Sequence, residues 1–225
     1  MPECVGIIMD GNRRWAKAQG MLTFKGHEVG AQKLKETVRW ARDIRLKHLI
    51  FFAFSTENWH RSEEEVFYLL NLIGSLLKKE LQTFIEQDGV LHCVGDISRF
   101  SAELQTIIKE AEEKTAKNSG VHIYLAFNYG GRQEIISAVK KILKDNPKPE
   151  DITEDYFAKH LQTYPMPDPD IIIRTSGEMR LSGFLPWQGV YSELFFTKTL
   201  WPDFSKEEFL KILEEYGNRE RRIGK

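Results

Sequence analysis

The sequence predicts an α/β fold: a single domain with a mostly parallel central sheet flanked by helices. Short apolar runs alternate with helix-type periodicity along all 225 residues, which is the pattern of strand–helix–strand units. The length fits one domain, residues 1–225, with a sizeable core. Polar clusters also follow several apolar runs directly. Ligands of parallel sheets bind beyond the carboxyl ends of the strands, so we expect these clusters to share one cleft.

Six apolar runs are the expected strands. Most of them are rich in branched or aromatic side chains, and several end at a polar or glycine residue. They are residues 5–9, 48–54, 90–94, 121–127, 171–173 and 190–197.

Helices are predicted between these runs. Apolar residues recur at helical spacing after Gly30, at Ala31, Leu34, Val38 and Ala41. Ser62 and Glu65 resemble a capping box, which predicts a long helix from there to about Glu86. The remaining helices are expected after Ser98, from about Arg132, after Thr153 and after Ser205.

Composition and charge exclude several classes of protein. The net charge is -1, so the chain lacks the basic excess of a nucleic-acid-binding protein. Cys4 and Cys93 lie far apart without metal-like spacing, which predicts a reduced, cytoplasmic protein. The first residues, Met-Pro-Glu-Cys, lack the basic and then apolar layout of a secretory signal, so none is expected. The longest uncharged apolar stretch, residues 66–77, is shorter than the roughly 18–20 residues that span a bilayer.

The first polar cluster follows residues 5–9. Asp10 and Gly11 come first, and then Asn12, Arg13, Arg14 and Trp15. A carboxylate at a strand end, followed by arginines on the first turn of a helix, suits a diphosphate with Mg²⁺. An Asp-Gly turn before an exposed basic helix is the alternative, and composition does not separate the two.

The second cluster lies after residues 48–54. It gathers hydroxyl, carboxylate, amide, indole and guanidinium groups in one loop, at Ser55, Thr56, Glu57, Asn58, Trp59 and Arg61. A polar loop with a helix cap is the alternative, and this cluster taken alone favours that alternative somewhat over a site.

The third cluster follows residues 171–173. Arg174 and Arg180 lie in a loop with Ser182, and two arginines can bind a second diphosphate through paired hydrogen bonds. A surface loop with ordinary salt bridges is the alternative. Strand alternation places Glu193 on the face of Tyr191 and Phe195. A carboxylate among aromatic side chains needs a partner, either a metal ion or an arginine.

Two features stay ambiguous from the residues alone. His27 is a lone histidine, and such residues are more often structural than catalytic. The apolar surface of the long helix after Ser62 is wider than that of an ordinary amphipathic helix. From the residues alone, we interpret this surface as part of the core and not as the wall of a lipid tunnel.

Taken together, these segments resemble the cis-prenyltransferase family over nearly the whole chain. Any one motif is weak evidence, but so many in order make a specific pattern. They are residues 9–16, Gly26-His27, residues 53–59, Gly95-Asp96, residues 128–132, residues 170–178, Trp187-Gln188, Tyr191, Glu193-Leu194, residues 200–204 and residues 219–224.

The resemblance implies a role for each matched residue. Asp10 and Glu193 would hold Mg²⁺, and Asp10 would help an allylic diphosphate to leave. The allylic diphosphate would be bound by Gly11, Asn12, Arg13, Arg14 and His27, and isopentenyl diphosphate by Arg174, Arg180 and Ser182. The reacting ends would be lined by Ser55, Glu57, Asn58, Trp59 and Arg61, and the substrate-binding set also includes Trp15, Thr23, Thr56 and Leu181. Because a neutral amide is a poor base, Asn58 would orient the substrates while a diphosphate oxygen takes the proton.

The resemblance also implies a cis-polyprenyl diphosphate product, whose tail occupies an apolar tunnel beside the long helix. It implies a homodimer in which Arg222-Ile223-Gly224 reaches the neighbouring site, and peripheral membrane contact during product release. The chain departs from the family pattern at Thr23, where many members have an arginine that Lys25 could replace, and at Ser62, where proline is common.

Three other classes of protein fit the residues less well. A non-catalytic scaffold subunit of the same fold would lose the diphosphate-binding residues, but this chain keeps them. A phosphatase or nucleotide-binding enzyme could also use Asp10. The sequence does not favour this class, because it contains no Gly-x-x-x-x-Gly-Lys-Ser/Thr phosphate-binding loop. A trans-type prenyltransferase needs aspartate-rich motifs, and the chain contains no Asp-Asp pair.

Overall fold

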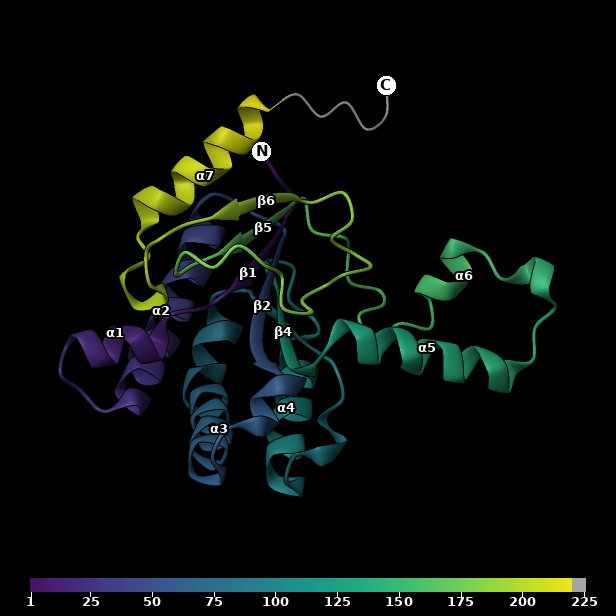
Figure 1. Cartoon of the computed structure of the whole chain (residues 1–225), viewed down its shortest axis with the longest axis horizontal. Helices are drawn as coiled ribbons and strands as arrows, with labels where there is room; N and C mark the ends of the chain where they lie inside the picture. Colours follow the sequence, from purple (N-terminus) through teal and green to yellow (C-terminus); the bar gives the residue numbers. More distant parts are fainter. Residues whose placement is uncertain (220–225) are drawn as a thin grey trace.

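The six predicted apolar runs form one sheet in which every neighbouring pair of strands is parallel (Figure 1). The computed structural model describes residues 1–219, which build one α/β domain. The strand order is β3-β4-β2-β1-β5-β6. The strands are β1 (Cys4–Ile8), β2 (His48–Ser55), β3 (Val90–Val94), β4 (His122–Tyr129), β5 (Ile171–Arg174) and β6 (Glu193–Phe196).

Seven α-helices are found among the described residues. They are α1 (Asn12–Ala18), α2 (Thr23–Asp43), α3 (Glu63–Glu86), α4 (Ala102–Thr115), α5 (Gly131–Asp145), α6 (Glu154–Ala158) and α7 (Lys206–Asn218). Short 3₁₀ helices, η1 (Thr56–His60), η2 (Ile97–Arg99), η3 (Pro149–Asp151) and η4 (Trp201–Asp203), join them.

Three predicted boundaries were wrong. Helix α2 begins at Thr23, well before Gly30, because the glycines inside it pack closely against α1 and do not break the helix. Helix α4 begins after Ser101, whose hydroxyl accepts a hydrogen bond from the Leu104 N–H, while the 3₁₀ turn η2 intervenes after Asp96. Strand β6 is shorter than residues 190–197.

The two faces of the sheet carry different cores. Side chains alternate along a strand, so Val5 and Ile7 face one side of β1 while Ile8 faces the other. On the first side, buried residues of α2, α3, α4 and α7 complete the larger cluster. On the second side, Phe184 and Leu185 of the β5–β6 connection cover the strands.

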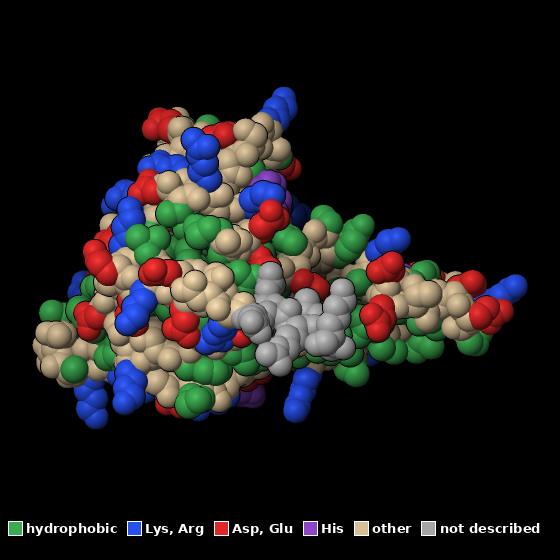
Figure 2. Space-filling view, turned by 90° about the horizontal axis from the view of Figure 1, so that it is seen from above, with side chains coloured by type: hydrophobic (Ala, Val, Ile, Leu, Met, Phe, Trp, Pro, Cys, Tyr) green, Lys and Arg blue, Asp and Glu red, His purple; other side chains and the backbone are tan. Residues whose placement is uncertain are grey.

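Helices α5 and α6 form an arm that projects from the body of the molecule (Figures 1 and 2). Figure 2 shows hydrophobic side chains along this arm, and charges of both signs mixed over the visible face. Within the described part of the chain, no helix combines the length and apolarity that crossing a membrane requires.

The strand order places a switch point beside β1. The chain proceeds from β1 to β2, β3 and β4 on one side and then returns to β5 on the other. Ligands of open parallel sheets bind in the crevice at such a point, beyond the carboxyl ends of the strands.

Candidate active site

A cleft of about 650 Å³ opens at the carboxyl ends of β1, β2 and β5. All three predicted polar clusters contribute to it, which confirms that they share one cavity. The predicted residues that line it are Asp10, Gly11, Asn12, Arg13, Arg14, Thr23, His27, Ser55, Asn58, Arg61 and Arg174.

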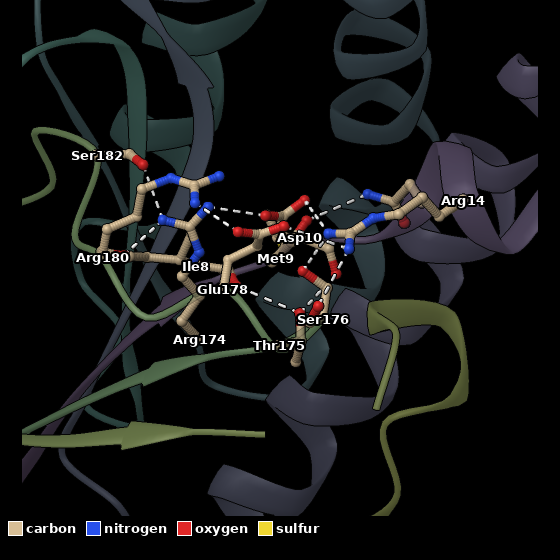
Figure 3. Close-up of polar contacts among 11 residues, drawn as sticks. Ile8, Met9, Asp10, Arg14, Arg174, Thr175, Ser176, Glu178, Arg180 and Ser182 are labelled. Carbon is tan, nitrogen blue, oxygen red and sulfur yellow. Dashed lines mark hydrogen bonds and ion pairs between the residues drawn. The ribbon is translucent and has the colours of Figure 1, made fainter. Parts of the chain in front are cut away.

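Asp10 lies at the centre of a network of arginines (Figure 3). The Arg174 guanidinium donates a hydrogen bond to the Asp10 carboxylate over 2.8 Å, and an Arg14 nitrogen lies 3.6 Å from the other carboxylate oxygen. Arg14 also donates to the backbone oxygen and the hydroxyl of Ser176. Helix α1 and the loop after β5 are thereby held against each other across the cleft.

The backbone that carries Asp10 depends on glycine at the next position. Gly11 has φ +108°, a left-handed conformation that side chains disfavour, and an added Cβ would lie 2.9 Å from Leu200. The Asp10 carbonyl accepts hydrogen bonds from the Thr175 hydroxyl and the Trp201 N–H. The chain therefore turns sharply from β1 into α1, and the carboxylate is fixed at the turn.

Asp10 is ionised at neutral pH. Burial alone would raise the pKa of this carboxyl, but the hydrogen bond and charge of Arg174, with the charge of Arg14, hold the pKa below its ordinary value. Arg174 itself is only 4% exposed, so its charge needs this counter-ion.

Glu65 of α3 is the hub of a second charged group. Its carboxylate accepts a hydrogen bond from Arg61 over 2.8 Å and lies 3.8 Å from Arg13 and 3.7 Å from the His27 ring. Burial and the nearby charge of Arg61 lower the pKa of His27 to about 4, so the imidazole is neutral near pH 7. His27 Nε2 is buried without a hydrogen-bond partner, as is the Asn12 side-chain oxygen. Such unsatisfied polar atoms fit a site built for a ligand.

The loop after β2 presents Asn58 to the cleft. The Asn58 side-chain oxygen accepts a hydrogen bond from the Ser55 N–H over 3.0 Å, and its amide nitrogen has no protein partner within residues 1–219. Trp59 does not line the cleft. Its indole donates to Asn128 over 2.7 Å, and the Arg99 guanidinium lies 4.2 Å from the ring centre.

The loop after β5 supports Arg174 from the other side. Arg174 donates to the Ser182 hydroxyl over 2.8 Å and to the Arg180 carbonyl. The Arg180 side chain is exposed and forms an ion pair with Glu178, which also pairs with Arg14. Arg180, Ser182 and the partly buried Leu181 thus border the cleft without lining it.

Glu193 does not join Asp10 within one chain. The parallel register pairs Glu193 with Ile171, at the amino end of the sheet, whereas Asp10 follows the Ile8–Arg174 pair at the carboxyl end. Its carboxylate pairs with Arg219 over 2.6 Å. Among residues 1–219, no group of three His, Cys, Asp or Glu side chains is placed to hold a metal ion. Arg222-Ile223-Gly224 lies outside the described residues.

Other predicted residues lie elsewhere. The Trp15 indole donates to Asp203, Glu57 is exposed, and Thr56 faces a different cavity. Thr23 lines the cleft, but Lys25 does not, because its ammonium pairs with Glu28.

Sequence reasoning missed several residues of the site. Lys17 lines the cleft, and its position one helical turn after Arg13 and Arg14 could have indicated this. Ser176, which anchors Arg14, lies in a segment that was already recognised as polar. Glu65 was interpreted only as part of a helix cap.

An apolar cavity of about 100 Å³ adjoins the cleft beside α3. The two cavities share Met9, Asn12, His27, Ala53 and Leu69, so they lie side by side. Further in, the walls come from α2, α3 and β4 and include Leu34, Leu72, Ile73, Leu76 and Phe127. A polar cleft beside an apolar cavity suits a ligand with a charged head and a hydrocarbon tail.

Comparison with known proteins identifies the same combination of fold and motifs in related chains. A family model described as putative undecaprenyl diphosphate synthase matches residues 8–224. The isoprenyl transferase of Thermotoga maritima is 46% identical, with 100% of this chain and 97% of that protein covered. That of Staphylococcus haemolyticus is 45% identical, with 100% and 89% covered.

Two solved structures share the fold closely. Lavandulyl diphosphate synthase from Lavandula x intermedia, crystallised with dimethylallyl diphosphate, superposes with a TM-score of 0.95 at 36% identity, covering 100% of this chain and 98% of that chain. A probable undecaprenyl diphosphate synthase from Campylobacter jejuni gives a TM-score of 0.84 at 31% identity, covering 100% and 99%.

Proposed function

Because the chain belongs to the undecaprenyl diphosphate synthase family of prenyl-transferring enzymes, we propose that it condenses isopentenyl diphosphate with an allylic diphosphate to give a cis-polyprenyl diphosphate, assisted by Mg²⁺. In this reaction the allylic carbon–oxygen bond breaks and inorganic diphosphate leaves. A carbon–carbon bond forms with isopentenyl diphosphate, and one proton is lost.

A single observation carries the proposal: one cleft gathers an ionised aspartate and several guanidinium groups and shares a wall with an apolar cavity. Arginine binds phosphate oxygens through paired, charge-assisted hydrogen bonds. Arg13, Arg14 and Arg61 would bind the allylic diphosphate, and the loop with Arg174 and Arg180 would bind isopentenyl diphosphate. The allylic tail would occupy the cavity beside α3.

Asn58 fits a positioning role. A neutral amide cannot act as a strong base, but its unpartnered amide nitrogen can donate a hydrogen bond to a substrate oxygen. His27 is neutral, and its unsatisfied Nε2 can likewise interact with the diphosphate. The released proton would pass to a diphosphate oxygen.

Mg²⁺ suits the chemistry of Asp10. In phosphate sites Mg²⁺ is commonly held by one or two carboxylates together with waters and substrate oxygens, and not by a closed protein cage. Asp10 supplies one ionised carboxylate that faces the cleft, and the substrate would supply further oxygens. Bound there, the ion would neutralise negative charge on the leaving diphosphate.

The test is incubation of the purified protein with labelled isopentenyl diphosphate and either dimethylallyl or farnesyl diphosphate, with and without Mg²⁺. We expect chain-lengthened products only when Mg²⁺ is present. Chromatography will give the length of the products, and comparison of the two allylic diphosphates will show which one the protein prefers. No lengthened product from any starter would favour a non-catalytic scaffold subunit.

We also propose that the protein works as a homodimer in the cytoplasm, with peripheral membrane contact when the product leaves. The exposed apolar side chains of Val139 and Leu143 on α5 support an interface on the arm. Both cysteines are free, which suits a reducing compartment. Light scattering after size-exclusion chromatography tests the dimer, and Leu143→Glu should shift it toward monomer.

A further inference from the structure

A further cavity, of about 490 Å³, lies beyond the carboxyl ends of β3 and β4, and none of its lining residues lines the cleft. We call it the α5 cavity. It contains residues of two motifs that the proposed chemistry does not use, residues 95–96 and 128–132. Its wall also includes Thr56, from the loop that presents Ser55 and Asn58 to the cleft. That loop therefore separates two cavities.

Three cations line the α5 cavity: Arg99, Arg132 and Lys140. None of them forms an ion pair with any carboxylate within residues 1–219. In the cleft, by contrast, most of the arginines form ion pairs. The one carboxylate in the wall, Asp96, accepts a hydrogen bond from the Ser98 N–H. Asp96 also interacts electrostatically with Arg99, but three cations against this one carboxylate leave the cavity with an excess of positive charge.

The backbone adds donors to these cations. Helix α5 begins at the wall of the cavity, and the N–H groups of Arg132 and Gln133 have no acceptor among the described residues. The acid in this first turn, Glu134, is buried and bonds to Tyr129, Thr163 and Gln188, which lie outside the cavity. Its charge is therefore directed away from the site.

We propose that the α5 cavity is a second anion site, which binds a small molecule carrying a diphosphate or longer phosphate chain. Two guanidinium groups and an ammonium match the several oxygens of such a group better than those of a single carboxylate. An open pocket of this volume, with exposed cations at its wall, can admit a small ligand. A nucleic-acid strand would require a basic surface, and the chain has a net charge of -1.

Binding in this cavity has a built-in spectroscopic signal. The Arg99 guanidinium lies over the Trp59 ring at 4.2 Å, and a phosphate group that draws Arg99 away changes the surroundings of that indole. Tryptophan fluorescence should therefore respond to occupancy, and the response should disappear in Trp59→Phe.

The experiment is a calorimetric titration of the full chain with inorganic tripolyphosphate. The double variant R132Q/K140Q removes two cations that lie on the exposed face of α5, and K144Q is the matched control, because Lys144 is exposed on the same helix but does not line the cavity. We expect tripolyphosphate to bind both the cleft and the α5 cavity in the wild type and in K144Q. In R132Q/K140Q the cleft event should persist, while the α5 event weakens at least tenfold. Equal affinity and stoichiometry in R132Q/K140Q and the wild type would overturn the proposal.

Two further measurements distinguish binding in the α5 cavity from binding in the cleft, and a nucleotide ligand from a free phosphate chain. Arg14→Gln, which alters the cleft, should retain the binding event that R132Q/K140Q loses. If ADP binds more tightly than inorganic diphosphate, the ligand is a nucleotide; equal affinity assigns the site to the phosphate chain alone. The binding assay does not depend on turnover, so a failed prenyl transfer assay and a failed binding assay give distinct results.

Discussion

The Arg174 guanidinium and the Asp10 carboxylate form a hydrogen bond of 2.8 Å although the two residues are 164 positions apart in the chain. The parallel register explains the contact. Ile8 pairs with Arg174, so the residue that follows the end of β1 emerges beside the last residue of β5. The same pair neutralises a buried arginine and places an ionised carboxylate at the cleft. One contact therefore contributes both to the packing of the loop after β5 against β1 and to the charge of the cleft.

Asp10→Asn should abolish most turnover. It should also lower the stability, because buried Arg174 loses its charged partner, but the protein should still fold. The amide keeps an oxygen that can accept from Arg174, but it is neutral and a poor ligand for Mg²⁺. We expect a loss of roughly 100-fold or more in single-turnover rate, the scale of removing one electrostatic stabiliser of a transition state. Asp43→Asn is the control, because Asp43 is exposed and pairs with Lys206. A nearly normal rate in Asp10→Asn would reject the metal assignment.

Glu178→Gln should tighten the binding of isopentenyl diphosphate. Glu178 pairs with both Arg14 and Arg180, so it competes with an incoming diphosphate for these cations. Partly exposed ion pairs contribute about 0–1 kcal/mol each, which predicts a KM lower by roughly two- to fivefold. Arg180→Ala should raise the KM instead. Glu110→Gln, which breaks an exposed pair on α4, should change nothing. A higher KM in Glu178→Gln would mean that Glu178 orients the arginines.

The central cleft could be predicted from the sequence because strand ends in a parallel sheet meet at one edge. Asp10, Asn58 and Arg174 each lie at or just beyond an apolar run, and the structure brings them to one cavity. The prediction needed only strand positions and direction, which apolar periodicity provides.

Contacts that depend on the length of a strand or the direction of a long side chain could not be predicted in this way. Glu193 opens β6 at the opposite edge of the sheet, and only the register reveals it. Lys25 turns to Glu28, while Lys17 reaches the cleft. Both lysines lie near Thr23 in sequence, so composition does not distinguish them.

Gly26→Ala should destabilise the protein through a clash between α1 and α2. A Cβ at Gly26 would lie 2.0 Å from the Asn12 carbonyl oxygen, a backbone atom that cannot move away without shifting α1. Overpacking of this kind costs about 1–3 kcal/mol. Gly217→Ala in α7 is the matched control. Its Cβ meets nothing within 4 Å, so it should raise the free energy of unfolding by about 0.5–1 kcal/mol. Urea unfolding measures the free energy of unfolding of both variants. If the two substitutions changed this free energy equally, the close approach of α1 and α2 at Gly26 would be contradicted.

His27 should make the protein less stable as the pH falls from 6.5 toward 4. Burial, with the charge of Arg61, lowers its pKa to about 4 from an ordinary value of 6.5. In this window the unfolded chain takes up a proton that the folded protein does not, so the free energy of unfolding falls with pH, and the stability is fully present above 6.5.

Between pH 7 and pH 5, His27 should account for a loss of about 2 kcal/mol. Urea unfolding at the two pH values should therefore show a smaller loss in His27→Gln than in the wild type. Exposed His60, changed to Gln, is the control and should behave as the wild type does. The other histidines contribute alike to both proteins and cancel in the difference. If His27→Gln lost as much stability as the wild type, the imidazole would already be protonated in the folded cleft, beside Arg13 and Arg61, and could not act there as a neutral group.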